Sequence, residues 1–163
     1  MNLLIKDSSL IDLKNLEREN WLLCAKLSLD YSQRDYVAPN VYSIAESKVE
    51  EHYCPRVICF NDEVVGFLIY CVEIDPPDKT LFWLFRFMIG KDNQAKGYGT
   101  TALQMAIDEI FTKGAKRIRT MYKSSNYVAG KLYKKMGFIE TGEYDESGDI
   151  ILELNISVQK NAN

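Results

Sequence analysis

The segment QAKGYGTTAL, Gln94 to Leu103, places two glycines between the apolar run FWLFRFMIG and a helical pattern. A helix that begins at Gly97 or Tyr98 exposes its first backbone N–H groups and the positive end of its dipole. Glycines there let an anion approach the backbone, and Gln94 and Lys96 add a donor and a cation. The segment therefore indicates a phosphate-binding loop. A purely steric reason for glycine at a strand-to-helix turn is the alternative.

The segment NYVAGKLYKKMGF, Asn126 to Phe138, has a second pattern that suits chemistry. Asn126, Ala129 and Tyr133 stand at i, i+3 and i+7, so on a helix an amide, a methyl group and a phenol share one face. Such a face can line a groove. Gly130 costs a helix interior roughly 1 kcal/mol relative to alanine, which is reasonable where another group packs against the backbone. A helix-capping asparagine and a core-packed tyrosine are the alternative.

The first part of the chain predicts a strand and a helix. LLIK, residues 3–6, has the composition of a strand. Asp7 or Ser8 can then cap a helix that carries three leucines on neighbouring faces, Leu10, Leu13 and Leu16.

The rest of the chain alternates strands and helices. After a loose, aromatic-rich segment, Ser43 and Glu46 predict a capping box for a helix through about His52. Apolar residues at helical spacing, ending at Phe111, indicate a helix that lies on a sheet and ends at Gly114. The strands are expected at residues 56–60, 64–73, 81–90, 116–122, 138–144 and 149–156, with a last helix ended by Gly137. The order β-α-α-β-β-β-α-β-α-β-β predicts an α/β fold with a mixed, mostly antiparallel sheet.

Composition limits the classes of protein that fit. The 163 residues, 47% hydrophobic and 26% charged, predict a single domain over residues 1–163. No stretch approaches the ~20 apolar residues of a membrane span, and an early polar break argues against a secretory signal, so we expect a soluble, cytoplasmic protein. A net charge of -3 argues against a nucleic-acid partner. Irregularly spaced cysteines and a single histidine predict free thiols and no metal site.

Together the two segments resemble the GCN5-related N-acetyltransferase family. The family's cofactor signature, Gln or Arg, two residues, then Gly-x-Gly, is matched by QAKGYG. Its second signature, Asn-x-x-Ala-x-x-Leu-Tyr-x-x-x-Gly-Phe, is matched by NYVAGKLYKKMGF. The expected order of elements is that of the family along almost the whole chain. The resemblance implies that acetyl-coenzyme A binds at Phe87, Met88, Ile89, Gln94, Ala95, Lys96, Gly97, Tyr98, Gly99, Thr100, Asn126, Ala129 and Tyr133.

The same resemblance implies direct transfer of an acetyl group to a substrate amine. Tyr133 matches the family position of the general acid that protonates the departing thiolate. An acidic residue often stands near the position of Phe85 in polyamine-acetylating relatives, and here that position is apolar. Glu73, on the neighbouring predicted strand, is the candidate base in its place. A solvated surface carboxylate at Glu73, with water as the proton carrier, is the alternative.

As a whole, the sequence is most similar to the spermine and spermidine acetyltransferases of bacteria within that family. An acidic protein suits a polycationic acceptor, because opposite charges attract. We expect a negative, ring-lined groove for a polyamine, formed by Tyr31, Asp35, Tyr36 and Glu73. A protein amino terminus, a lysine or a small antibiotic amine is the alternative substrate, and a non-catalytic acetyl-coenzyme A-sensing or interaction domain is the alternative class. Relatives are often dimers, so a homodimer is one possible assembly.

Overall fold

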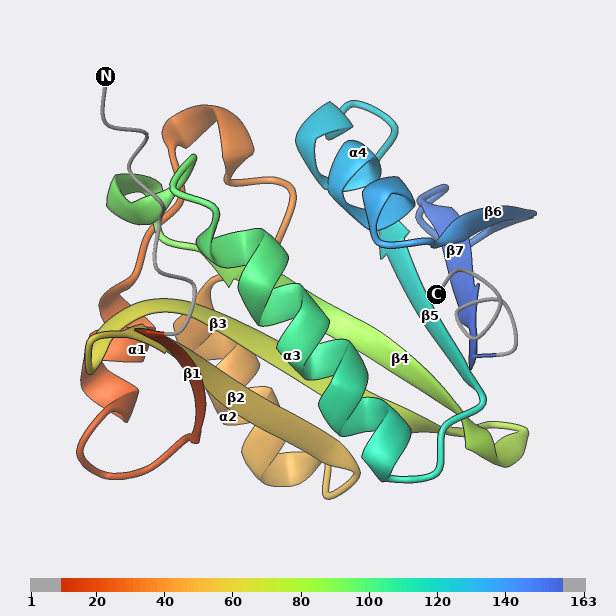
Figure 1. Cartoon of the computed structure of the whole chain (residues 1–163), viewed down its shortest axis with the longest axis horizontal. Helices are drawn as coiled ribbons and strands as arrows, with labels where there is room; N and C mark the ends of the chain where they lie inside the picture. Colours follow the sequence, from red (N-terminus) through yellow and green to blue (C-terminus); the bar gives the residue numbers. More distant parts are fainter. Residues whose placement is uncertain (1–9, 157–163) are drawn as a thin grey trace.

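The computed structural model describes residues 10–156, which form an α/β fold around one seven-stranded sheet (Figure 1). The strands lie in the order β1-β2-β3-β4-β5-β7-β6. In chain order the elements are β1 (Ile11–Asn15), α1 (Trp21–Lys26), η2 (Tyr31–Gln33), α2 (Asn40–Val49), β2 (Tyr53–Phe60), β3 (Glu63–Ile74), β4 (Pro77–Ile89), η3 (Lys91–Asn93), α3 (Tyr98–Thr112), β5 (Arg117–Tyr122), α4 (Tyr127–Lys135), β6 (Ile139–Tyr144) and β7 (Ile150–Asn155).

Neighbouring strands of this sheet pair antiparallel, with the exception of β4 and β5. Short turns join β2, β3 and β4 into a meander, whose strands are rich in β-branched and aromatic residues. β5 can run parallel to β4 because α3 forms the crossover connection between them. The predicted mixed, mostly antiparallel sheet is therefore confirmed.

Helices cover both faces of the sheet, with α3 and α4 on one face and α1 and α2 on the other (Figure 1). The central strand β3 shows why, since successive side chains of a strand point to opposite faces. Leu68 and Tyr70 belong to the core cluster that includes Leu103 of α3. Phe67 and Ile69 belong to a second cluster with residues of α1 and α2. β3 is thus buried on both faces, as its continuous apolar sequence requires.

The predicted helix over the first leucines is wrong, because β1 occupies Ile11–Asn15. This strand pairs antiparallel with β2, from Ile11 opposite Phe60 to Asn15 opposite Arg56. Ile11 and Leu13 alternate toward the same core cluster, so tertiary pairing determines the structure here and the leucine spacing does not. The first helix of the described chain is α1, and the predicted strand at residues 3–6 lies outside the described residues.

The second helix also differs from its prediction. α2 begins at Asn40 after Pro39, and it ends at Val49 rather than near His52. Ser43 is buried within the helix and its backbone N–H donates to the carbonyl of Pro39, so it is not a cap. Pro39 is instead the N-cap residue of α2, with φ of -54° and ψ of 141°.

Each of the four cysteines is a free thiol, as their irregular spacing predicted. Burial raises the pKa of Cys24 and of Cys71 to about 12, so neither is a thiolate at neutral pH. Within residues 10–156, no helix combines the length and apolar character needed to cross a membrane.

Candidate active site

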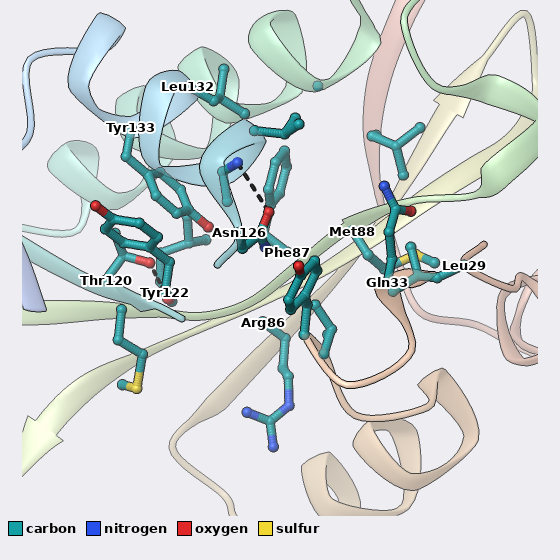
Figure 2. Close-up of a pocket in the computed structure, with 18 of the residues that line it drawn as sticks. Leu29, Gln33, Arg86, Phe87, Met88, Thr120, Tyr122, Asn126, Leu132 and Tyr133 are labelled. Atoms are coloured by element: carbon teal, nitrogen blue, oxygen red, sulfur yellow. Dashed lines mark hydrogen bonds between the residues drawn. The ribbon is translucent and has the colours of Figure 1, made fainter. Parts of the chain in front are cut away.

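A cavity of about 670 Å³ lies where the sheet splits between β4 and β5. The two strands pair only from Leu81–Arg117 to Trp83–Arg119, and beyond this point they diverge. The walls are the last part of β4, the end of β5, the start of α3 and one face of α4. The α1–α2 loop and the β6–β7 turn complete them. Figure 2 shows many of these side chains converging from different elements.

A β-bulge shapes the β4 wall. Tyr70 pairs with Leu84 and Ile69 pairs with Arg86, which leaves Phe85 without a partner in the ladder. After the bulge, Phe87 and Ile89 pack toward the core cluster of α3, while Met88 enters the cluster on the other face. Because β5 has diverged, this part of β4 presents an open edge to the cavity.

The start of α3 forms the second wall. Gly97 precedes the helix with φ of 84° and provides no side-chain cap. Tyr98, Gly99 and Thr100 are the first residues of the helix and line the cavity. Their backbone N–H groups precede the first intrahelical bond, from the Thr101 N–H to the Gly97 carbonyl. The helix dipole adds to their attraction for an anion, as the glycine spacing indicated.

The residues before Gly97 hold the loop in place. Gln94 donates through Nε2 to the Ile89 carbonyl at 3.0 Å and to Gln33 Oε1 at 2.9 Å. Gln33 returns a bond from its own Nε2 to Gln94 Oε1 at 3.2 Å. Gln94 and Ala95 line the cavity, whereas Lys96 is absent from its wall and lies 5.9 Å from the Tyr98 ring centroid. The predicted donor at Gln94 therefore fastens the α1–α2 loop to the glycine loop.

The face of α4 contributes Asn126, Ala129 and Tyr133 to the wall. Asn126 caps the helix, because its side chain accepts the Ala129 N–H at 3.3 Å. The glycine inside this helix is required by packing. A Cβ at Gly130 would lie 2.6 Å from Cε2 of Tyr122, so the ring of that tyrosine lies against the backbone of α4.

Tyr133 combines burial with a position on the cavity wall. Only 5% of the residue is exposed, and its ring packs against Phe138 with centroids 5.8 Å apart. Burial raises the pKa of Tyr133, and the adjacent Thr120 hydroxyl opposes that shift. Thr120 also donates to the Leu84 carbonyl at 3.0 Å, where β4 and β5 part (Figure 2). Tyr133 is therefore protonated at neutral pH and can act as a proton donor.

The sequence profile of the acetyltransferase (GNAT) family matches residues 11–138. The chain belongs to this family. Among its relatives, the probable spermine N(1)-acetyltransferase of Bacillus subtilis subsp. natto (strain BEST195) is 28% identical over 146 residues, covering 87% of this chain and 96% of that protein.

Two crystal structures of acetyltransferases share the GNAT fold. The spermidine N-acetyltransferase from Vibrio cholerae, in complex with CoA and spermine, has a TM-score of 0.74 at 18% identity, covering 91% of this chain and 97% of that one. The aminoglycoside acetyltransferase AAC(6')-Ib in complex with coenzyme A has a TM-score of 0.78 at 15% identity, covering 93% and 98%.

The predicted substrate residues of this GNAT acetyltransferase do not gather in one place. Tyr36 lines the cavity, and its hydroxyl donates to the Ser125 carbonyl at 3.2 Å. Tyr31 is 80% exposed, and neither it nor Asp35 belongs to the wall. The α1–α2 loop thus faces the cavity through Tyr36 and not through its other aromatic and acidic residues.

Glu73, the expected base of the acetyltransferase, lies outside the cavity wall. Its carboxylate accepts the Trp83 indole N–H at 2.8 Å and the backbone N–H groups of Ile74 and Asp75 at 2.9 and 3.0 Å. Burial alone would raise the pKa of Glu73, but these hydrogen bonds outweigh it and lower the pKa. A carboxylate stabilised in this way is a weak base.

Three residues of the β6–β7 turn, Asp145, Ser147 and Asp149, line the cavity of this acetyltransferase and were missed as site residues. The sequence identified DESGD only as a turn, and no local pattern indicates which cavity a turn will face. Arg86 is also in the wall, but its guanidinium extends toward α2, 3.5 Å from Glu46 Oε2 (Figure 2). Apart from Arg86, the formally charged residues in the described part of the wall are therefore the acidic Asp145 and Asp149.

Proposed function

We propose that this acetyltransferase moves an acetyl group from acetyl-CoA to a primary amine of a polyamine such as spermidine or spermine. The observation that carries the proposal is one continuous cavity with two unlike ends. An uncapped helix N-terminus suits an anion at one end, and the acidic β6–β7 turn suits a cation at the other. The Bacillus subtilis relative, a probable spermine N(1)-acetyltransferase, supports the same substrate class.

The residues around the glycine loop fit the cofactor. The N–H groups of Tyr98, Gly99 and Thr100 would hold the pyrophosphate, and the open edge of β4 from Phe87 to Ile89 would hold the pantetheine arm. When bound, acetyl-CoA supplies an acetyl group activated as a thioester. Gln94 would keep the loop in position through its bonds to Ile89 and Gln33.

Tyr133 is the proposed proton donor to the departing sulfur. Its hydroxyl is buried on the wall of the same cavity, and its raised pKa keeps the proton in place until it is needed. General acid catalysis of this kind contributes typically about 10²-fold to 10⁴-fold to a rate.

The acceptor end is suited to an ammonium group on aromatic and acidic surroundings. Tyr36 provides a ring face, and Asp145 and Asp149 provide the negative charge. Each added ammonium of a polyamine would strengthen the attraction to a protein with a net charge of -3. A cytoplasmic location and a homodimer stay predictions from the sequence.

An amine panel tests this function. Acetyl transfer from acetyl-CoA would be measured for spermine, spermidine, a monoamine, an aminoglycoside and a peptide amino terminus. We expect the two polyamines to have the highest kcat/KM. A peptide or aminoglycoside that exceeds both polyamines would overturn the polyamine assignment and leave amine acetylation in place. Acetyl-CoA binding without transfer to any amine would favour a cofactor-sensing domain instead.

A further inference from the structure

The cavity wall contains two carboxylates, and only one of them is committed to the fold. Asp145 Oδ1 accepts the backbone N–H groups of Ser147 and Asp149, each at 2.8 Å, and so fixes the turn. The carboxylate of Asp149 has no hydrogen bond or ion pair within residues 10–156, although this side chain is partly buried. Asp149 is thus a part-buried acid of the wall that is left for a ligand.

An acetyltransferase that acts on amines needs a proton acceptor. An alkyl ammonium has a pKa of about 10, so the substrate arrives protonated at neutral pH and cannot attack a carbonyl. Glu73 is engaged elsewhere, and Tyr133 is protonated. Among the described residues that line the cavity, Asp145 and Asp149 are the acidic ones, and only Asp149 is unengaged.

We propose that Asp149 is the catalytic residue that accepts the proton of the substrate amine. The proposal rests on the proposed amine acetylation and names the base of that reaction. Asp149 lies on the wall of the same cavity as Tyr133, so the proton acceptor and the proton donor serve one reaction space.

The electrostatic surroundings suit this role. Burial raises the pKa of Asp149, the neighbouring Asp145 raises it further, and Lys123, before α4, lowers it. Arg86 is the other formal charge on the wall, and it faces α2. A carboxylate with a raised pKa is a better proton acceptor than an ordinary one, because a general base works best with a pKa near the operating pH.

The proton balance of the step is complete without another reactant. The first ammonium proton passes to Asp149 and from there to water. The nitrogen then forms a bond to the acetyl carbonyl carbon while the carbon–sulfur bond breaks, and Tyr133 protonates the leaving sulfur. The nitrogen loses its second proton to water, and Tyr133 regains one from water. Each turnover therefore yields the amide and the free thiol and releases one proton.

The first test is kinetic and compares Asp149→Asn with Glu146→Gln. The asparagine keeps the shape of the side chain and removes its basicity, whereas Glu146 is an exposed residue of the same turn outside the cavity wall. We expect Asp149→Asn to lower kcat/KM for spermine by about 10²-fold at neutral pH. Glu146→Gln should retain nearly full activity. A loss below threefold in Asp149→Asn, or an equal loss in both variants, would overturn the proposal.

The pH profile provides a sharper criterion. Protonated Asp149 cannot accept a proton, so wild-type kcat/KM should fall as the pH drops through the raised pKa of this carboxyl. In Asp149→Asn the break at this pKa should disappear, and activity should rise steadily with pH until the amine itself is deprotonated. A break at the same pH in both proteins would assign it to another group.

A binding measurement does not depend on turnover. Spermine is titrated into the protein alone by calorimetry, at mildly acidic pH, in two buffers with different heats of ionisation. An ammonium beside Asp149 lowers its pKa, so wild type should release protons on binding and Asp149→Asn should release none. Equal proton release would overturn the proposal. If wild type acetylates no amine, the proposed function fails, and proton release still decides whether Asp149 faces the ammonium.

Discussion

The two ends of the cavity are built in different ways. The proposed cofactor end consists largely of backbone, namely the first N–H groups of α3 and the open edge of β4. The proposed acceptor end consists of side chains from the α1–α2 loop and the β6–β7 turn, far apart in the sequence. Backbone sites follow from local geometry that glycine spacing can indicate. Side-chain sites depend on how distant segments meet, so they vary without a change of fold.

The α1–α2 loop connects the two ends. Gln33 forms its reciprocal amide pair with Gln94 on the cofactor side, and Tyr36 donates to the Ser125 carbonyl beside α4. The loop therefore contacts both sides of the cavity, at the segment before α3 and at the segment before α4. A comparison of variants at the two ends can separate cofactor binding from acceptor handling.

The largest expected effect is on the cofactor end, with Gly99→Glu. A carboxylate near the first turn of α3 would face the cofactor phosphates, and two like charges ~4 Å apart near a protein surface repel by about 4 kcal/mol. The affinity for acetyl-CoA, measured by calorimetry, should fall by about 10³-fold.

Gln104→Glu is the matched control for this variant. It adds the same charge to the exposed face of α3, where Gln104 donates to Asp108 and is absent from the cavity wall. Its affinity should stay near that of wild type, and circular dichroism should show both variants folded. If folded Gly99→Glu binds acetyl-CoA normally, the anion site is not at this helix.

The next largest effect is expected from Tyr133→Phe, a change at a residue between the two ends of the cavity. The ring keeps its packing against Phe138 and loses the hydroxyl, so kcat should fall by about 10²-fold while acetyl-CoA affinity hardly changes. Tyr144→Phe, at an exposed tyrosine outside the cavity wall, is the control. A decrease of kcat below threefold in Tyr133→Phe would remove this residue from the proton-donor role.

Much of the fold could be predicted because most elements carry their own pattern. The stripe of α3, the Asn126 cap of α4 and the apolar run of β4 are contiguous signals, and each element lies close to its expected place, although β4 begins at Pro77, four residues before its predicted start. The first helix failed for the opposite reason. Leu13 repeats at helical spacing with its neighbours, yet the backbone of Ile11–Asn15 pairs with β2, and only the tertiary structure supplies that partner.

The site residues divide in the same way, into those close together in the sequence and those that only the fold brings together. The glycine loop and the face of α4 could be predicted because their residues are close in sequence and match a family signature, and both line the cavity. Glu73 was chosen for its strand, but nothing in the sequence reveals that Trp83 occupies its carboxylate. Asp149 was passed over as a turn residue, since the cavity that a turn faces depends on how β6 and β7 pack beside α4.

A smaller effect is expected from Gln33→Ala, which cuts the connection between the two ends. The variant removes two hydrogen bonds to Gln94, each with a net contribution of about 1 kcal/mol, so acetyl-CoA affinity should fall by up to about 30-fold. Gln104→Ala, which loses one exposed hydrogen bond on α3, should change affinity little. If only the KM for the amine rises, Gln33 contacts the acceptor, and its role in fixing the glycine loop is disproved.

The smallest effect concerns the acceptor end, where the attraction is between charges rather than through a fixed hydrogen-bond geometry. Salt screens exposed charges over a Debye length of about 10 Å at 0.1 M and about 3 Å at 1 M, so kcat/KM for spermine should fall several-fold across this range. A monoamine carries fewer charges toward Asp145 and Asp149, so its kcat/KM should fall less. Parallel slopes for the two amines, measured at constant acetyl-CoA saturation, would mean that the acidic turn does not select polycations and that shape or aromatic contact does.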